Sequence, residues 1–218
     1  MIPDIYSTLR QIVTTPPVRN VTEKVIELAQ LCLRFARVNR VTYHEDGKRL
    51  ETDADHTVML GIVACAFAER FAPHLDLGLI AQFALVHDLV EAYAGDTNTL
   101  RISAERARAK EEIEAAALAK IVEQFGVALP WVTATIKQYD RLDTPEARFI
   151  KTLDKVLPKI THALNLGAAL REHGVQPGDI DAINGAQYAK IVASYGADQP
   201  EAMALYQSVH EYLKSVLI

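Results

Sequence analysis

Cysteine is scarce in this chain of 218 residues, which contains only Cys32 and Cys65. Both fall within apolar helical patterns, so we expect buried thiols and no disulfide framework. The sequence also lacks a glycine-rich phosphate loop and a Rossmann fingerprint, two common means of holding a nucleotide. Basic residues are not in surplus, because 23 Lys and Arg stand against 28 Asp and Glu. This balance excludes a broad nucleic-acid footprint but leaves the binding of a single nucleotide open.

Long hydrophobic runs are missing as well. The first residues, MIPDIYSTLRQIVTTPP, contain acid and proline but no apolar stretch typical of a signal peptide. No stretch approaches the roughly 20 apolar residues of a membrane span. We therefore expect a cytoplasmic protein with no membrane partner and no nucleic-acid partner.

What is present is a helical signal along almost the whole chain. Hydrophobic residues make up 50% of the sequence and charged residues 23%, which is ordinary for a globular protein. Apolar residues recur at spacings of three and four, which favours helices and an all-α fold. Asn20 is expected to cap the first helix. The predicted helices cover residues 20–38, 55–71, 75–94, 103–125, 130–139, 144–173, 179–195 and 200–217.

Two places interrupt this helical pattern. The turn signal Asp46-Gly47 lies between two short segments, residues 41–43 and 48–50, so a hairpin and an irregular loop fit equally well. Pro158 lies within the predicted helix over residues 144–173 and cannot bond to the carbonyl of Asp154. We therefore expect a kink in that helix beside Asp154.

The most informative segment is HDLVEAYAGD, residues 87–96, at the end of an apolar stretch. Burying ionisable groups there is costly unless they are paired or bound to metal. His87 and Glu91 are four residues apart and share one helical face, with Asp88 on an adjacent strip. Gly95 supplies a helix stop, and Asp96 follows in the loop. The segment predicts a cluster of metal ligands and acids at a helix end.

Two further residues are candidates for the same cluster. His56 lies at the start of a predicted helix, and Asp154 lies between apolar residues that indicate an inward-facing position. Taken separately, His56 fits a helix cap, and Asp154 fits an ion pair with Lys151 or Lys155. Two histidines and two carboxylates form a mixed nitrogen and oxygen set. Such a set suits Mn, Co, Fe, Ni or Zn better than Ca or Mg, which favour oxygen.

The order His56, His87-Asp88, Asp154 resembles that of the HD-domain metal-dependent phosphohydrolases. The closer similarity is to the 5'-deoxynucleotidase subfamily, in which Glu and then Gly-Asp follow the His-Asp pair, and it covers roughly residues 28–170. The resemblance implies a single-domain HD-domain helical bundle with one divalent transition metal. The implied ligands are His56, His87, Asp88 and Asp154, and the implied residues that assist at the phosphate are Glu91 and Asp96.

The same resemblance divides the chain and points to a phosphate-binding arginine. We expect an N-terminal extension over residues 1–19, an HD-type catalytic helical domain over 20–174, and C-terminal helices over 175–218 packed on the same domain. Arg40 occupies the place of the arginine that follows the first helix in relatives, with Arg34, Arg37 and Arg49 as rivals. Arginine can grip a phosphate with two parallel hydrogen bonds. Val41 stands where some relatives have an aromatic residue near the sugar, so no ribose preference is predicted.

The predicted function is removal of the 5'-phosphate from (deoxy)nucleoside monophosphates, a small-molecule nucleotide substrate. One alternative is an HD-type deoxynucleoside triphosphate triphosphohydrolase, and another is a catalytically silent nucleotide-binding HD module. The guanosine-tetraphosphate hydrolases have Asp directly after the corresponding Glu, whereas this chain has Ala92 there. A homodimer is also expected, because relatives are often dimers. Aromatic residues assigned to the outer helices point the same way: Trp131, Tyr188, Tyr195, Tyr206 and Tyr212.

Overall fold

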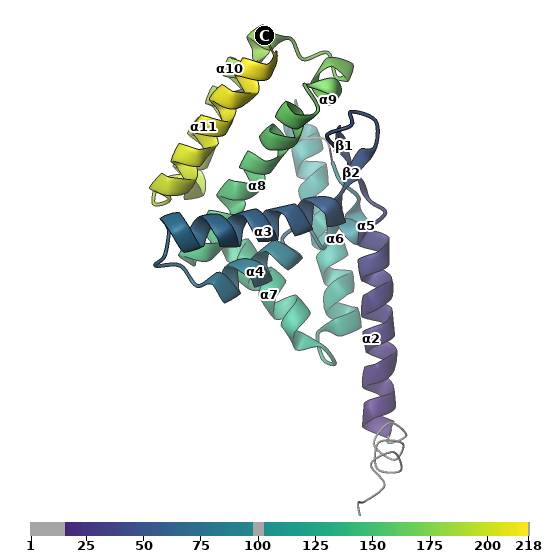
Figure 1. The fold of residues 1–218 in the computed structure, drawn as a ribbon. Helices are drawn as coiled ribbons and strands as arrows, with labels where there is room; N and C mark the ends of the chain where they lie inside the picture. Colours follow the sequence, from purple (N-terminus) through teal and green to yellow (C-terminus); the bar gives the residue numbers. More distant parts are fainter. Residues whose placement is uncertain (1–15, 98–102, 218) are drawn as a thin grey trace, which may run out of the picture.

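The computed structural model describes residues 16–97 and 103–217, and its described part is built almost entirely of helices (Figure 1). The only sheet among these residues is a two-stranded one, so the all-α prediction is confirmed. The first half contains α2 (Pro16–Phe35), β1 (Asn39–Tyr43), β2 (Leu50–Thr52), α3 (Asp53–Phe71), α4 (Leu77–Val86), α5 (Glu91–Ala94) and α6 (Ala104–Phe125). The second half contains α7 (Pro130–Arg141), α8 (Pro145–Leu164), α9 (Ala168–Glu172), η1 (Pro177–Asp179), α10 (Ile180–Ile191), η2 (Val192–Gly196) and α11 (Pro200–Leu217).

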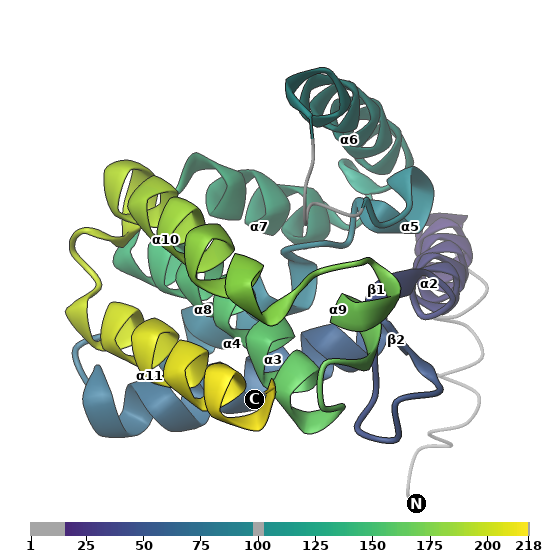
Figure 2. The same cartoon turned by 90° about the horizontal axis from the view of Figure 1, so that it is seen from above.

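Helix α8 is the central element, and it contacts α3, α4 and α11 (Figure 2). Its residues Phe149, Ile150, Leu153 and Leu157 are almost fully buried in the largest apolar cluster. A second cluster joins α2, α6 and α7 through residues such as Phe35, Ile121 and Ile136. Because α8 is packed on several sides, a polar residue on it is held in a fixed place.

Residues 39–52 form a hairpin, which decides between the two possibilities left open by the sequence. β1 pairs antiparallel with β2, with Asn39 opposite Thr52 and Tyr43 opposite Leu50. Thr52 then caps α3: its side chain accepts from the amide of Asp55, and the Asp55 carboxylate accepts from the amide of Thr52. This reciprocal capping box starts α3 directly after the strand. His56 is thereby placed in the first turn of α3.

The predicted single helix over residues 75–94 is wrong, because α4 ends at Val86 and α5 begins at Glu91. Between them, the amide of Leu89 bonds to the carbonyl of Val86, and the amide of Glu91 bonds to that of Asp88. These three-residue spacings are tighter than those of an α-helix. Gly95 ends α5 with a φ of 75°, as expected from its position.

The predicted helix over residues 144–173 is also two helices. α8 ends at Leu164, and α9 starts only at Ala168. The side chain of Asn165 explains the break, since its Oδ1 accepts from the amide of Ala168 and its Nδ2 donates to the carbonyl of Tyr43. A tertiary contact with β1 therefore competes with helix continuation. Pro158 lies inside α8, which continues through it.

Other expectations fail at the surface and at the first helix. α2 extends from Pro16 to Phe35, so Asn20 lies inside it and is not its cap. Residues 1–15 of the expected N-terminal extension lie outside the described part.

Cys32 is exposed and Cys65 is half-buried, and both are free thiols, so the prediction of buried thiols is wrong. Tyr206 is fully buried in the core and is not an outer aromatic residue.

One segment meets the length and composition of a membrane span, contrary to expectation. Residues Leu77–Ala94 have a mean hydropathy of 1.3. Core helices of folded proteins meet the same criteria, and here α4 packs against α3, α7 and α8. The segment also contains the ionisable residues His87, Asp88 and Glu91 at the site described next.

Candidate metal centre

Four side chains from three parts of the fold meet at one point. One ligand atom from each of His56, His87, Asp88 and Asp154 lies within 4.8 Å of the other three. Nε2 of His56 lies 3.0 Å from Oδ1 of Asp154, and Nε2 of His87 lies 3.8 Å from the same oxygen. The structure thus brings together all four predicted ligands, from α3, the α4–α5 turn and α8.

The orientation of the two histidines fits a metal ion. Nδ1 of His87 donates to the carbonyl of Ala84 at 2.8 Å, and Nδ1 of His56 lies 3.2 Å from Oε1 of Glu51. With each proton on Nδ1, each Nε2 presents a lone pair to the carboxylates. Nε2 of His87 lies 3.0 Å from Oδ2 of Asp88 yet makes no well-oriented hydrogen bond and is buried. Such facing acceptors are stabilised by a cation between them. Oxygen acceptors bonded to Nδ1, as Ala84 and Glu51 are here, fix the orientation of metal-binding histidines.

Both carboxylates are held in the ionised form that a metal ligand needs. Burial opposes the ionisation of Asp154, but the ammonium of Lys155 at 2.6 Å and the two histidines outweigh it and hold the pKa of Asp154 well below its usual range. Burial likewise opposes the ionisation of Asp88, and His87 lowers the pKa of Asp88 far below its usual range. Asp154 forms the ion pair with Lys155 that the sequence also suggested, and it still belongs to the group of four ligands.

Arg40 is the arginine that reaches this centre. Its Nη1 lies 3.3 Å from Oδ2 of Asp88 and 3.3 Å from Oδ1 of Asp53. The rivals lie elsewhere: Arg37 lines a separate shallow cleft with Arg34, and the exposed Arg49 pairs with Asp55.

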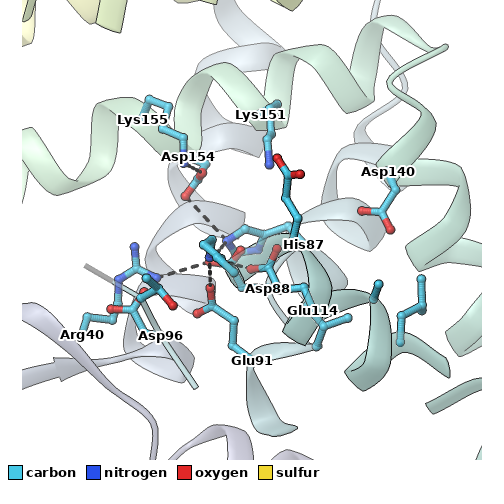
Figure 3. A pocket seen from close by; sticks show the side chains of 16 residues that line it. Arg40, His87, Asp88, Glu91, Asp96, Glu114, Asp140, Lys151, Asp154 and Lys155 are labelled. Carbon is cyan, nitrogen blue, oxygen red and sulfur yellow. Dashed lines mark hydrogen bonds and ion pairs between the residues drawn. The ribbon is translucent and has the colours of Figure 1, made fainter. Parts of the chain in front are cut away.

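A cavity of about 380 Å³ opens over the centre (Figure 3). Three residues of the centre line this cavity: His87, Asp88 and Asp154. Arg40, Glu91 and Asp96 line the same cavity. The remaining lining comes largely from α6, α7 and α8. These residues are Lys110, Glu111, Glu114, Ala115, Leu118, Asp140, Lys151 and Lys155.

Comparison with known proteins decides the family. Residues 33–194 match the family model described as HD domain. The chain belongs to the HD domain family. The predicted identification as an HD-domain metal-dependent phosphohydrolase is therefore confirmed at the level of the family, and so is the HD-domain helical bundle.

Two relatives of this HD domain show how far the similarity extends. The 5'-deoxynucleotidase hdd1 of Schizosaccharomyces pombe is 28% identical over 111 residues, which cover 48% of this chain and 53% of that protein. The chain thus matches about half the length of this curated relative. The crystal structure of a predicted metal-dependent phosphohydrolase from Magnetospirillum magnetotacticum MS-1 superposes with a TM-score of 0.66 at 24% identity. That match covers 88% of this chain and 98% of the other, and it supports the fold.

In this HD domain, Glu91 lies beside the centre and outside the group of four ligands. Its side chain is buried, and Nζ of Lys110 lies 3.2 Å from its Oε1. Burial, together with the charges of Asp88 and Asp53, raises the pKa of Glu91 to about 10. Asp96 lines the same cavity, and burial raises the pKa of Asp96 against the opposing charge of Arg40. Both shifts favour the protonated acid, and a divalent cation bound at the neighbouring centre would lower both pKa values again.

Sequence reasoning missed several charged residues around the HD centre. Glu51 accepts from Nδ1 of His56 and lies 3.4 Å from Nε of Arg40. Asp53 contacts Arg40, and Lys110 contacts Glu91. The only sequence signal for Glu51 and Asp53 was the run of acidic residues just before His56. Such a run is equally typical of the start of a helix. Lys110 lies on a charged helix that reads as solvated surface.

Proposed function

We propose that this HD-domain protein removes the 5'-phosphate of nucleoside monophosphates. The observation that carries this proposal is the shared cavity: three of the four ligands, together with Arg40, Glu91 and Asp96, line one space of about 380 Å³, and the fourth ligand, His56, lies directly behind them. A phosphate monoester needs such a combination of cation, water-handling acid and proton donor. The 5'-deoxynucleotidase activity named for the yeast relative supports the same substrate class.

The residues divide the chemistry between them. A divalent metal held by His56, His87, Asp88 and Asp154 would acidify a water molecule and offset charge on the phosphoryl oxygens. Arg40 binds a phosphate oxygen by charge-assisted hydrogen bonds. Glu91 orients the attacking water and takes its proton, and Asp96 supplies a proton to the leaving 5'-oxygen. Water oxygen bonds to phosphorus as the bond to the 5'-oxygen breaks, which yields a nucleoside and inorganic phosphate.

The charge of the cavity favours a monophosphate over a triphosphate. Carboxylates outnumber cations among the described lining residues. Arg40, Lys110 and Lys155 already have carboxylate partners. Among the described residues, Lys151 is the one lining cation with no carboxylate within 4.0 Å. A triphosphate brings more negative charge than Lys151, the remaining donors of Arg40 and one metal ion can offset.

The silent nucleotide-binding alternative is disfavoured by the same geometry. All four ligand positions are filled by residues able to coordinate a metal, and their ligand atoms converge. Glu91 and Asp96 are also present at the cavity. A module that only binds nucleotides has no need of the buried Glu91 and the half-buried Asp96, both with raised pKa values, beside a metal centre.

A substrate and metal screen tests the proposal. The purified protein is stripped with a chelator and reloaded separately with Mn, Co, Fe, Ni or Zn. Each form is then assayed with nucleoside 5'-mono-, di- and triphosphates and with the matching 3'-monophosphates, in both ribose and deoxyribose series. We expect release of inorganic phosphate from 5'-monophosphates and much slower turnover of the matching 3'-monophosphates. Release of intact triphosphate from nucleoside triphosphates would instead support the triphosphohydrolase, and inactivity of every metal form would support the silent module.

A matched variant separates this activity from contamination. Asp154→Asn keeps the size of the side chain but weakens a predicted metal ligand. Purified in the same way, this variant should lose most of the phosphate release seen with wild type. Equal activity in both preparations would mean that the activity belongs to another protein.

A further inference from the structure

Asp53 is a buried carboxylate that the mechanism above does not use. It is the first residue of α3, and its side chain has no exposed surface. It lies outside the group of four predicted metal ligands. A buried carboxylate is costly unless it is paired. Its placement beside the centre therefore calls for a partner and a role.

The first partner of Asp53 is Arg40. Oδ1 of Asp53 lies 3.3 Å from Nη1 of Arg40, which lies equally far from Oδ2 of Asp88. Nε of Arg40 lies 3.4 Å from Glu51. The guanidinium is thus held along its Nε and Nη1 positions. Among the described residues Nη2 has no hydrogen-bond partner, so its donors remain for a substrate phosphate.

The second partner is Glu91. Oδ2 of Asp53 and Oε2 of Glu91 are both buried and find no hydrogen-bond donor when both groups are ionised. The two side chains nevertheless lie close enough for a hydrogen bond to form between them. Two carboxyl groups can form that bond only with one proton between them.

We infer that Asp53 is a positioning residue that holds Arg40 and Glu91 in place on either side of Asp88. The carboxyl group of Asp53 contacts the phosphate-binding guanidinium and lies beside the Glu91 carboxyl group that handles water. Figure 3 shows Arg40 reaching Asp88 and Glu91 lying on the same side of the cavity. This inference rests on the roles proposed above for Arg40 and Glu91. A long arginine side chain loses much rotamer freedom when it binds, and prior fixation by Asp53 reduces that loss.

The test compares Asp53→Ala with Asp53→Asn in the metal-loaded protein. Alanine removes both contacts, so KM for the 5'-monophosphate should rise and kcat should fall, each about tenfold. Asparagine can still accept from Arg40 and can donate to the Glu91 carboxylate. It should therefore restore both constants to within about threefold of wild type. Bound metal should stay unchanged in both variants.

Titration calorimetry with inorganic phosphate gives a second readout that does not depend on turnover. We expect Asp53→Ala to weaken phosphate binding about tenfold and Asp53→Asn to leave it within about threefold. If wild type hydrolyses no nucleoside monophosphate, the proposed function fails while calorimetry still tests Asp53. If wild type is active and Asp53→Ala binds phosphate and turns over as wild type does, the positioning role fails alone.

Glu146→Ala is the matched control for loss of a buried carboxylate. Glu146 is buried in the first turn of α8 and accepts from the backbone amide of Asp76, away from the cavity lining. The Glu146→Ala variant should have a lower melting temperature than wild type, with unchanged KM and unchanged phosphate affinity. Should Asp53→Ala fail to fold, as judged by circular dichroism, Asp53→Asn decides. A tenfold or greater loss of phosphate affinity in folded Asp53→Asn would overturn the inference.

Discussion

Nε2 of His56 lies 3.0 Å from Oδ1 of Asp154, although the two residues are 98 positions apart in the chain. His56 is placed by the capping box that starts α3, and Asp154 is placed by the buried faces of α8. Without a metal, burial opposes protonation of His56, but hydrogen bonds to Asp154 and Glu51 prevail and raise the pKa of His56. Proton and metal therefore compete for the same position between these residues.

Metal removal should accordingly lower both activity and stability. We expect a chelator to abolish phosphate release and to lower the melting temperature, and one divalent metal to restore both. Metal affinity should weaken as pH falls, because the raised pKa of His56 favours its protonated form. Atomic absorption after dialysis, with calorimetry at several pH values, measures this. A stripped protein with full activity would contradict the prediction.

Glu91→Ala should abolish turnover while the metal stays bound. The reason is that Glu91 acts on the water and its carboxylate lies outside the group of four ligands. Metal content and kcat are measured on the same preparation, with Glu91→Gln as the matched variant that keeps the shape. Loss of metal in Glu91→Ala would make Glu91 a ligand and change the mechanism.

Arg40→Ala should chiefly weaken substrate binding, by about 1.5–3 kcal/mol if it removes a charged hydrogen bond. Binding of inorganic phosphate or of the 5'-monophosphate, measured by calorimetry, gives the change directly. Arg49→Ala is the control, because Arg49 is exposed and pairs with Asp55 outside the cavity lining. An unchanged affinity in Arg40→Ala, with a loss in Arg49→Ala, would move the phosphate role to Arg49.

Pro158→Ala should raise stability and reduce activity. Proline removes one helical hydrogen bond to the carbonyl of Asp154, so alanine restores that bond and relieves a clash. A metal ligand tolerates little displacement, so the same change should lower metal affinity or kcat. Thermal melts and kinetics are compared on one preparation. A variant that is more stable and fully active would show that packing alone places Asp154.

His162 should make the folded protein less stable in mild acid. Burial lowers the pKa of His162 to about 4, and its Nδ1 lies 3.3 Å from the hydroxyl of Thr42. Below the unfolded-state pKa of about 6.5 only the unfolded chain gains this proton, so stability falls as pH falls from there toward 4. The loss should be about 2 kcal/mol at about pH 5.

Urea titrations at about pH 7.5 and about pH 5 measure this loss. His162→Gln should remove about 2 kcal/mol of the pH dependence. His74→Gln is the control, because His74 is exposed and should leave the pH dependence of wild type in place. An identical pH dependence in wild type and His162→Gln would refute the role of His162.

The helical segments and the four candidate ligands could be predicted from the sequence because they depend on local patterns. Apolar spacing of three and four reports which face of a segment is buried, whatever it packs against. The order His56, His87-Asp88, Asp154 needs only the residue types and their sequence positions. Gly95 stops its helix as expected, because its positive φ is a local property.

Helix continuity was decided by tertiary contacts. Between α4 and α5, a tighter turn replaces the helix. At Asn165, the side chain bonds across the fold to the carbonyl of Tyr43 and interrupts the helix. Nothing in the periodicity of either segment marks these points. The exposure of Cys32 has the same cause, since an apolar pattern does not say how much of α2 is covered by neighbours.

The sequence by itself determined that this chain is an all-α HD-domain protein with two histidines and two carboxylates in the order of a metal site. Only the tertiary structure decided which charges surround that site. Glu51 reaches Arg40 from strand β2, Asp53 reaches Arg40 from the start of α3, and Lys110 reaches Glu91 from α6. The physical reason is that ion pairing depends on distance and burial, and both arise only when β2, α3, α5 and α6 are brought together.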